Sequence, residues 1–476
     1  MRSFGGGHGP AGHRMRTPGC TRRQAIGRCA TVVLAAGVLD AACGPRTARP
    51  IKAIANPVVL VWRPWQNFPS GTNLRTAFGL MYEATAPFRA QHKGLEIKLS
   101  AVSPQGGTVT SLLAGEGPDV FEDWVLNMFT DQGLALDLAP MIQRDSVNLS
   151  VLPAGMVDYI RANGRNSPSR HGFFAMPDYL NTKAMAVNLG ALSTLGIAAP
   201  QPEWTYADWA DMWKKSSSRG KHRTGGGIYW YNGHGNNTGP GPWYLHAFGG
   251  GYVDPQNTAR AGLTSSGSLQ FFDFLMPLIS SGAVAPWANG SFRAGQQISE
   301  AIGTAGSLMS AAENWDSLRW DLFPMPTGPK GRFTAGYLGF YAIDAQTKQP
   351  DLAWEFVKWL CLGETWQKFM IHLNLHGPIL VQLWSEWQAM VQAAAPPLRS
   401  KSVDVIVQQV QNNQAWTGLP FKYADDACGK IISAYISAML AQRLSVQEAM
   451  QQCTQQITAY EQQAANEVTA PKGKAG

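Results

Sequence analysis

Apolar positions along the chain follow two periods, one typical of strands and one typical of helices. Val58–Trp62 is a β-branched run suited to a buried strand, and Leu95–Leu99 alternates as a second strand. Leu74–His92 between them carries the apolar spacing of a helix. Thr108–Ala114 predicts a further helix that a glycine ends, and Pro118–Phe121 a third strand. Strands that alternate with helices indicate a parallel sheet covered on both faces.

The later part of the chain is mostly helical. Met176–Asn188 is extended, and we expect it to cross between two lobes. Trp204–Trp213 begins with the spacing of a capping box and predicts a helix. Helical spacing returns at Leu269–Ile279 and Ala353–Met370, and Val403–Gln463 predicts two glutamine-rich helices separated by a short break. No repeat of fixed period is present, which excludes solenoids and propellers.

Residues 1–42 have the pattern of an export signal. Arginines precede an apolar run, Ala30–Leu39, that ends at two alanines. Ten apolar residues are too few to cross a bilayer, which needs about 20, and no later run is longer. Thr21–Gln24 contains two adjacent arginines and resembles a twin-arginine signal, with the general export route equally open. The start itself is open between Met1 and Met15.

Cys43 lies where a bacterial lipoprotein would carry its lipid. Leu39 and the small residues before Cys43 resemble a lipoprotein signal, whereas Asp40 departs from that pattern. We therefore expect lipidation of Cys43, with simple cleavage after Ala42 as the alternative. Residues 43–56 are polar and suit a tether, and residues 467–476 suit a frayed tail. The expected location is the cell surface or the periplasm, with contact to the membrane only through this anchor.

Charge and cysteines exclude several partners. Residues 1–42 hold six arginines and one aspartate, so their removal lowers the net charge from +7 to +2. A nearly neutral protein without a basic cluster is a poor candidate for nucleic-acid binding. Cys361, Cys428 and Cys453 have no spacing typical of a metal site, so we expect no metal. Pairing of Cys428 with Cys453 and burial of both as free thiols are both open.

Length and tryptophan content indicate a large protein rich in aromatic side chains. About 430 residues exceed what one hydrophobic core usually organises, so two lobes are expected. All 17 tryptophans follow Cys43, in a chain with only 15% charged residues. Some of them must be core, but so many favour a surface on which flat apolar ring faces stack.

The order of several short segments carries a family resemblance. These segments are Val58–Trp62, Leu112–Val120, Gly133–Leu138, Gly172–Asn188, Leu195–Ile197 with Pro202–Thr205, Gly249 and Gly250 with Asp254, Pro324–Pro326, and Ala353–Val357. Together they resemble the family 1 extracellular solute-binding proteins, the capture subunits of ABC importers for sugars and related solutes. The resemblance covers residues 57–460.

The resemblance implies an α/β, two-lobed periplasmic-binding-protein-like fold with a ligand cleft between the lobes and helical C-terminal additions. The N-lobe would comprise 57–178 with 332–385, and the C-lobe 179–331 with 386–466. The implied ligand is a sugar, oligosaccharide or polyol, and the implied partners are the permease subunits of an ABC importer. No cofactor and a monomeric state are expected.

A sugar offers hydroxyl edges and apolar ring faces, so its site needs aromatic platforms beside hydrogen-bonding side chains. The loop after the first strand provides both, at the carboxyl end of a strand where α/β sheets place ligands. Adjacent residues of an extended segment point to opposite sides, so one of Glu122 and Asp123 should face the cleft. The full set of candidates is Trp62, Arg63, Trp65, Gln66, Glu122, Asp123, Tyr179, Asn181, Trp243, Tyr244, Trp315, Gly336 and Tyr337. Trp62 fits the core of the protein equally well.

Two other classes of protein stay open. An exported glycoside hydrolase would also be rich in tryptophan and would need two carboxylates, for which Glu122, Asp123 and Glu313 are available. The chain lacks the GxSxG, HExxH and GxxxxGK[ST] motifs of other hydrolases and nucleotide-binding enzymes. A noncatalytic cell-wall or adhesion protein is the third reading. The family resemblance favours a receptor that is not an enzyme.

Overall fold

The computed structural model describes residues 58–469 apart from short segments. These segments are 65–73, 102–105, 124–125, 131, 154, 164–171, 220–225, 228–229, 234–235, 255, 286–291, 293, 304–305, 316, 375–376, 411–413 and 417–424. The predicted export signal, the tether and Cys43 lie outside the described residues. None of the helices that the structure describes is long and apolar enough to cross a membrane.

The first sheet has the strand order β17-β16-β3-β1-β2, with β4 pairing along β16. Its parallel part consists of β1 (Val58–Arg63), β2 (Leu95–Leu99) and β3 (Val120–Asp123). The other strands are β4 (Ala175–Asn181), β16 (Thr334–Ile343) and β17 (Gln414–Trp416). β16 runs antiparallel to β3 and β4 and parallel to β17. The three predicted strands are therefore confirmed as neighbours in one sheet.

Helices cover both faces of this sheet, as the sequence predicts. On one face, Trp62 of β1 contacts Phe356 and Trp366 at ring-centroid distances of 5.1 and 5.5 Å. On the other, Phe121 of β3 contacts Phe129 at 4.8 Å. The helices around this sheet are α2 (Leu74–Ala84), α3 (Ala86–Gln91), α4 (Gly106–Leu113), α5 (Asn127–Thr130), α6 (Ala139–Arg144), α7 (Met156–Asn163), α13 (Pro350–Leu362) and α14 (Glu364–Asn374), with a 3₁₀ turn at Leu149–Val151.

A second sheet has the order β12-β5-β13, with β5 (Lys183–Asn188) between β12 (Ser299–Gly303) and β13 (Trp320–Phe323). β5 is buried along its whole length, and its side chains alternate between two hydrophobic cores. Ala184 and Ala186 belong to the hydrophobic core that also packs against the first sheet, which we call the first core. Met185 and Val187 belong to a separate core, which we call the second core. This period-two alternation joins the two cores through one strand.

The second core is surrounded by helices and short hairpins. Its elements are α8 (Leu189–Thr194), α9 (Tyr206–Arg219), β6 (Gly226–Gly227), β7 (Trp230–Gly233), β8 (Asn236–Pro240), α10 (Pro242–Ala247), β9 (Val253–Asp254), β10 (Asn257–Ala261), α11 (Ser266–Ser280), β11 (Val284–Ala285), β14 (Thr327–Gly328), β15 (Gly331–Arg332), α17 (Asp425–Leu440) and α18 (Val446–Thr469). The indole N–H groups of Trp209 and Trp213 both donate to Ser299 Oγ, at 3.0 and 2.9 Å, which fixes α9 against β12.

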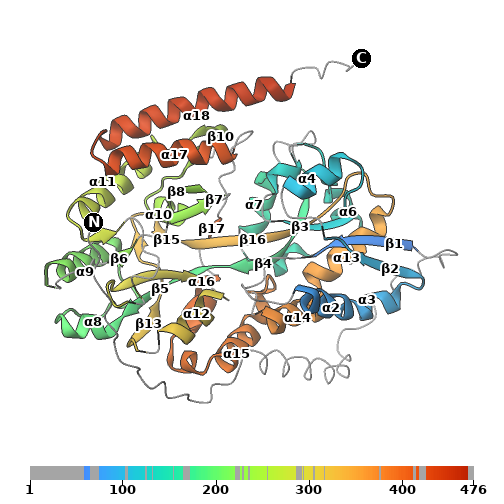
Figure 1. Ribbon diagram of the computed structural model, residues 1–476, viewed down its shortest axis with the longest axis horizontal. Coiled ribbons are helices and arrows are strands. Elements are labelled where there is room, and N and C mark those ends of the chain that lie inside the picture. Colours follow the sequence, from blue (N-terminus) through green and yellow to red (C-terminus); the bar gives the residue numbers. More distant parts are fainter. Residues whose placement is uncertain are drawn as a thin grey trace, which may run out of the picture. The chain divides into compact units, whose positions relative to one another are not determined.

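Two strands cross from one core to the other. Figure 1 shows β4 and β16 running through the middle of the ribbon, between the helices of the first sheet and those of the second core. β4 leads directly into β5, and β16 contributes Ala335 to the second core and Leu338 to the first. We call β4 and β16 the crossing strands. The predicted extended crossing at Met176–Asn188 is thus confirmed, while the lobe boundaries stay a prediction.

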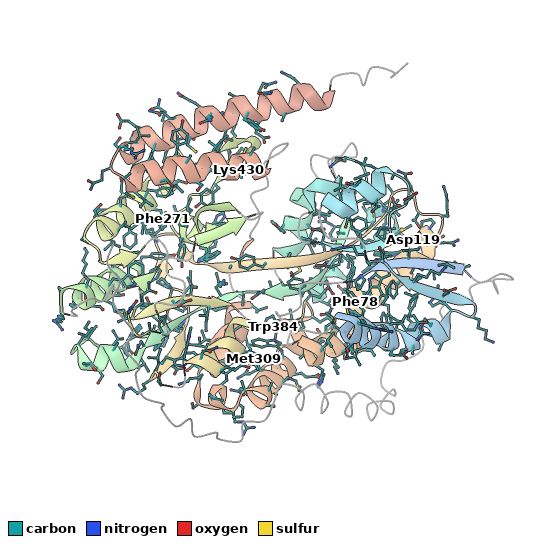
Figure 2. All side chains as sticks on the ribbon, viewed as in Figure 1. Phe78, Asp119, Phe271, Met309, Trp384 and Lys430 are labelled. Atoms are coloured by element: carbon teal, nitrogen blue, oxygen red, sulfur yellow. The ribbon has the colours of Figure 1, made fainter. Side chains whose placement is uncertain are left out.

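The remaining helices contribute side chains to the first core. They are α12 (Gly306–Asn314), α15 (Trp384–Ala394) and α16 (Asp404–Val410), with 3₁₀ turns at Val381–Leu383 and Pro396–Ser400. α15 and α16 belong to the first core, and Figure 2 places Trp384 beneath the crossing strands. The prediction of two helices over Val403–Gln463 was therefore wrong: this range contains α16, β17, α17 and most of α18.

Two other predicted helices are divided, each for a local reason. The helix predicted over Leu74–His92 ends at Ala84, and Pro87 lies in the first turn of α3, where its missing N–H does no harm. Gly363 separates α13 from α14 within the range predicted as one helix. The capping box before α9 is confirmed, since Thr205 and Asp208 exchange hydrogen bonds of 2.7 to 3.2 Å.

Cys361, Cys428 and Cys453 are buried, and none of them forms a disulfide within the part of the chain that the structure describes. The Cys428 thiol donates to Glu461 Oε1 at 3.6 Å, so α17 meets α18 at Glu461. Cys453 lies eight residues before Glu461 on α18, which is about 12 Å along a helix. Disulfide geometry requires Cα atoms within about 7 Å, so this register excludes a bridge between Cys428 and Cys453.

Candidate functional site

The crossing strands are almost entirely buried, and their partly exposed side chains share one face. In β4 the partly exposed residues are Tyr179 and Asn181, and in β16 the partly exposed residue is Tyr337. Tyr179 and Asn181 are two residues apart, and Tyr337 is the cross-strand partner of Asn181. Two phenol rings and one amide therefore meet on the same side of the crossing strands, and we call these three residues the crossing patch.

Tyr337 is supported from the second core. The Trp243 ring of α10 meets it edge-on at a centroid distance of 6.2 Å, and the Lys183 ammonium lies 5.7 Å from its ring centroid. Lys183 is only 6% exposed and follows Asn181 by two residues, on the same side of the chain. The crossing patch thus borders a cation–π interaction, in which the Lys183 ammonium is attracted to the face of the Tyr337 ring.

Gly339 lets Tyr179 lie flat against β16. Gly339 and Tyr179 are cross-strand partners, and a Cβ atom on Gly339 would lie 2.2 Å from Tyr179 Cε1 and 3.0 Å from Glu122 Oε1. The absence of a side chain at Gly339 therefore gives the Tyr179 ring its place beside the Glu122 carboxyl. This contact connects the crossing patch to the end of β3.

Three carboxyl groups and one guanidinium are buried at the ends of β1 and β3 and in the middle of β4. Arg63, Glu122, Asp123 and Asp178 are all at most 4% exposed. Arg63 Nη1 donates to the main-chain oxygen of Glu122 and lies 3.9 Å from Glu122 Oε2. We call Arg63, Glu122 and Asp178 the buried carboxyl cluster.

The acids of this cluster resist ionisation. Burial raises the pKa of Glu122 well above its usual value, Asp123 and Asp178 raise it further, and Arg63 opposes the change. Burial also raises the pKa of Asp178 to about 8, with the Trp366 indole acting in the opposite direction. On the other side of the patch, burial raises the pKa of Glu300 to about 7 against the influence of Lys183.

A hydroxyl pair fastens the two crossing strands at their other end. Thr334 Oγ1 donates to the Lys183 main-chain oxygen at 2.6 Å and lies 3.0 Å from Thr182 Oγ1. Gly336, a predicted ligand residue, is buried and pairs with Trp416 of β17, so its backbone contacts another strand. These contacts join β16 to β17 and to the segment between β4 and β5.

Several predicted ligand residues lie in hydrophobic cores, and their role in ligand binding stays a prediction. Trp62 is fully buried among Phe356 and Trp366. Tyr244 is fully buried and stacks on Phe271 with an interplanar angle of 4°. These rings fill core space between helices and sheets, so neither presents a face for a ligand.

Trp315 and Trp243, two further predicted ligand residues, are also buried. Trp315 is 8% exposed, at 4.5 Å from the Phe292 ring and 5.1 Å from the Trp320 ring, inside the first core. Trp243 is fully buried but touches Tyr337, so it supports the crossing patch from behind. Arg63 is likewise buried and braces Glu122 instead of facing outward.

Two predicted ligand residues fall in a segment that the structure does not describe. Trp65 and Gln66, at the predicted ligand loop, lie outside the described residues. Within the described part of the chain, no group of three or more His, Cys, Asp and Glu side chains is arranged to hold a metal ion.

Sequence reasoning missed Asp178, Lys183 and Gly339. Asp178 and Lys183 are charged residues in the extended segment that the sequence predicts to be buried, and a charge in such a segment is the signal that could have singled them out. Gly339 lies inside a ten-residue strand, where glycine is unfavourable unless another group approaches closely.

The fold is shared with several solved structures. The cyclic α-maltosyl-1,6-maltose binding protein from Arthrobacter globiformis superposes with a TM-score of 0.66 at 19% identity, covering 86% of this chain and 100% of that one. The ABC substrate-binding protein from Listeria monocytogenes in complex with cycloalternan gives 0.60 at 15% identity, covering 84% and 97%. The GacH receptor of Streptomyces glaucescens, described with acarbose, gives 0.56 at 16% identity, covering 86% and 98%. These likenesses establish the two-lobed α/β fold.

Family membership follows from the sequence itself. No curated protein matches the chain. The family model described as bacterial extracellular solute-binding protein matches residues 74–361, more than half of the chain. That match includes all three crossing-patch residues, and the chain belongs to the bacterial extracellular solute-binding proteins.

Proposed function

We propose that this protein captures an oligosaccharide outside the cytoplasm and delivers it to the permease subunits of an ABC importer. The observation that carries the proposal is the crossing patch, where Tyr179, Asn181 and Tyr337 share the partly exposed face of strands that join two cores. Family membership supports solute capture. The Arthrobacter protein is named for binding a cyclic maltosyl-maltose and the Streptomyces receptor is described in complex with acarbose, and both support an oligosaccharide as the solute class.

The chemistry of the patch suits a neutral sugar. The phenol rings offer apolar faces to the C–H faces of a pyranose, while the Asn181 amide donates to and accepts from hydroxyl groups. Glu122 borders the patch through Gly339, and its raised pKa leaves a carboxyl that can act as donor or acceptor. Arg63 is engaged with Glu122, which argues against an anionic group on the solute.

Several features favour a receptor over a glycoside hydrolase. A glycoside hydrolase needs two carboxyl groups that lie roughly 5 to 10 Å apart, one on each side of the glycosidic bond. The substrate must be able to reach both of them. Glu122 and Asp123 are buried beside Arg63, and Glu313 is exposed on α12. We therefore propose a protein without catalytic activity or cofactor, monomeric in solution. We further propose that it is exported and anchored through a lipid on Cys43.

We expect the mature protein to bind an oligosaccharide in a one-to-one complex and to leave it chemically unchanged. Thermal shift should be screened against maltotriose, mannotriose, acarbose, polyols, glycerophosphodiesters and peptides, because a bound solute raises the melting temperature by mass action. Chromatography of the recovered solutes runs in parallel. Hydrolysis of a solute would reject the receptor, and binding only to insoluble cell-wall polymer would favour an adhesion protein.

Gly339→Ala should weaken binding of the oligosaccharide found in this screen by at least about fivefold. The new methyl group would overlap Tyr179 Cε1 and turn the ring out of the crossing patch, and one lost stacking contact is worth about 1–3 kcal/mol. Isothermal titration measures the change. The matched control is Gly79→Ala in α2, where a Cβ meets nothing within 4 Å. Equal affinities for the two variants would remove Tyr179 from the proposed site.

A further inference from the structure

The chain passes from the first sheet to the second sheet between Asn181 and Lys183 (Figure 1). Asn181 and Tyr337 form the last pair of the ladder between β4 and β16, and two residues later Lys183 pairs with Gly303 of β12. Thr182, between the two strands, is fully buried. The main chain therefore leaves β16 directly beside the crossing patch, at a buried position.

The hydroxyl of Thr334 holds the Lys183 main chain after this ladder ends. It donates to the Lys183 main-chain oxygen at 2.6 Å and accepts from the Lys183 N–H at 3.2 Å. Thr182 Oγ1 lies 3.0 Å away. A hydroxyl has one hydrogen and two lone pairs, and the hydrogen of Thr334 goes to Lys183. Thr182 is therefore the donor between the two hydroxyls, and Thr334 Oγ1 uses its whole hydrogen-bonding capacity at this junction.

Lys183 connects this junction to Tyr337. Lys183 is 6% exposed, and its ammonium lies 5.7 Å from the Tyr337 ring centroid. That separation is within the range of about 6 Å in which a cation attracts an aromatic face. Because Thr334 binds both polar groups of the Lys183 main chain, it fixes the point from which the Lys183 side chain extends. β16 thus holds Lys183 twice, by a hydroxyl on its main chain and by a ring against its ammonium.

We propose that Thr334 is a positioning residue for the solute site: its hydroxyl fixes the Lys183 main chain, and the Lys183 ammonium in turn orients the Tyr337 ring of the crossing patch. Thr334 is 1% exposed, so it acts through Lys183 and does not contact the solute. The inference rests on the proposed function in one respect, that the crossing patch binds the solute. Its first test needs no solute, so it can fail independently of the proposed function.

Thr334→Val tests the hydroxyl, because valine has nearly the shape of threonine and cannot form a hydrogen bond through its side chain. The change takes one partner from each of two buried main-chain groups, the N–H and the C=O of Lys183. Thr334→Ser keeps the hydroxyl and should restore the wild-type behaviour. The matched control is Thr458→Val in α18, where the lost hydroxyl donates to the Thr454 oxygen of the same helix.

Fluorine NMR of protein labelled with 3-fluorotyrosine reports on the Tyr337 ring directly. The Tyr337 resonance is identified by its absence from Tyr337→Phe. Lys183→Met should shift this resonance, because it removes the cation beside the ring. Thr334→Val should shift it in the same direction, whereas Thr334→Ser and Thr458→Val should leave it in place. A resonance that stays in place in Thr334→Val or in Lys183→Met would overturn the proposal.

A second tyrosine separates positioning from a general loosening of the fold. The Arg89 guanidinium lies 4.2 Å from the ring centroid of Tyr82 in α2, so the Tyr82 resonance also responds to a nearby cation. Thr334→Val should leave the Tyr82 resonance unchanged. Equal shifts of Tyr82 and Tyr337 would show that Thr334 only stabilises the fold, which would overturn the positioning role.

Isothermal titration with the oligosaccharide from the screen tests the connection to binding. Thr334→Val should bind it at least about fivefold more weakly, because one contact of the site is made poorly, and Thr334→Ser should stay within about twofold of the wild type. Unchanged affinity of Thr334→Val would overturn its role at the solute site. If the wild type binds no oligosaccharide, the proposed function fails, and the fluorine spectra still decide whether Thr334 positions Tyr337.

The wild-type protein decides the matter if Thr334→Val does not fold. A buried hydroxyl that donates a hydrogen bond exchanges slowly with water and gives a proton resonance of its own. The Thr334 hydroxyl proton should therefore show a nuclear Overhauser contact with the Lys183 amide proton. A wild-type spectrum without this contact would show that the hydroxyl does not hold the Lys183 main chain, and it would overturn the proposal.

Discussion

Replacing Arg63 with methionine should lower the free energy of unfolding by about 1–3 kcal/mol, because it leaves the buried main-chain oxygen of Glu122 without its hydrogen-bond donor. Arg63 is fully buried, lies 3.9 Å from Glu122 Oε2 and donates to the Glu122 main chain. It joins the end of β1 to the end of β3. Urea unfolding of the solute-free protein at neutral pH measures the loss.

The control for Arg63→Met is Arg161→Met on the exposed face of α7, which should change stability by no more than about 0.5 kcal/mol. Unchanged stability of Arg63→Met combined with lost solute binding would mean that Arg63 contacts the solute. That result would restore the role that the sequence predicted for Arg63 and reopen the question of an anionic solute.

Trp315→Ala should cost about 3–5 kcal/mol of stability in the absence of solute, the usual range for removing a large aromatic side chain from a core. The Trp315 ring lies 4.5 Å from Phe292 and 5.1 Å from Trp320 by centroids, and only 8% of the residue is exposed. Chemical denaturation of the unliganded protein gives the value. Trp315→Phe should lose less, because it keeps part of the ring volume.

Trp315→Ala also tests the interpretation of the tryptophan content. Leu113→Ala serves as a control, because Leu113 is 59% exposed and its truncation should be nearly neutral. If Trp315→Ala kept full stability and bound the oligosaccharide more weakly, Trp315 would be a stacking platform. The sequence alone favoured that role, whereas the contacts with Phe292 and Trp320 favour the core.

The parallel strands were predictable because they are short apolar runs between helices. Val58–Trp62 and Leu95–Leu99 were assigned nearly to the residue, since burial on both faces leaves a continuous or alternating apolar run. The Thr205–Asp208 capping box was equally readable, because its partners are three residues apart. Local interactions of this kind are present in the sequence itself.

Non-local pairing was not predictable in the same way. β17 has only three residues. It is a strand because it pairs with β16, which lies about 80 residues earlier in the sequence. The tryptophans could not be assigned for the same reason. The number of tryptophans in a sequence does not show which of them lie in a core and which face a ligand, because that depends on non-local packing. Tyr179, Asn181 and Tyr337 were named from their place in the crossing, and their role in binding stays a prediction.

The alternation of β5 between two cores bears on attempts to divide the protein. One face of β5 completes the core of the first sheet and the other completes the second core, so a cut between the halves leaves an apolar sheet face in water on either fragment. Neither fragment should be soluble when expressed alone. A biosensor built on this scaffold should therefore carry its reporter domain at a surface loop, such as the turn between α17 and α18, and keep β4 and β5 continuous.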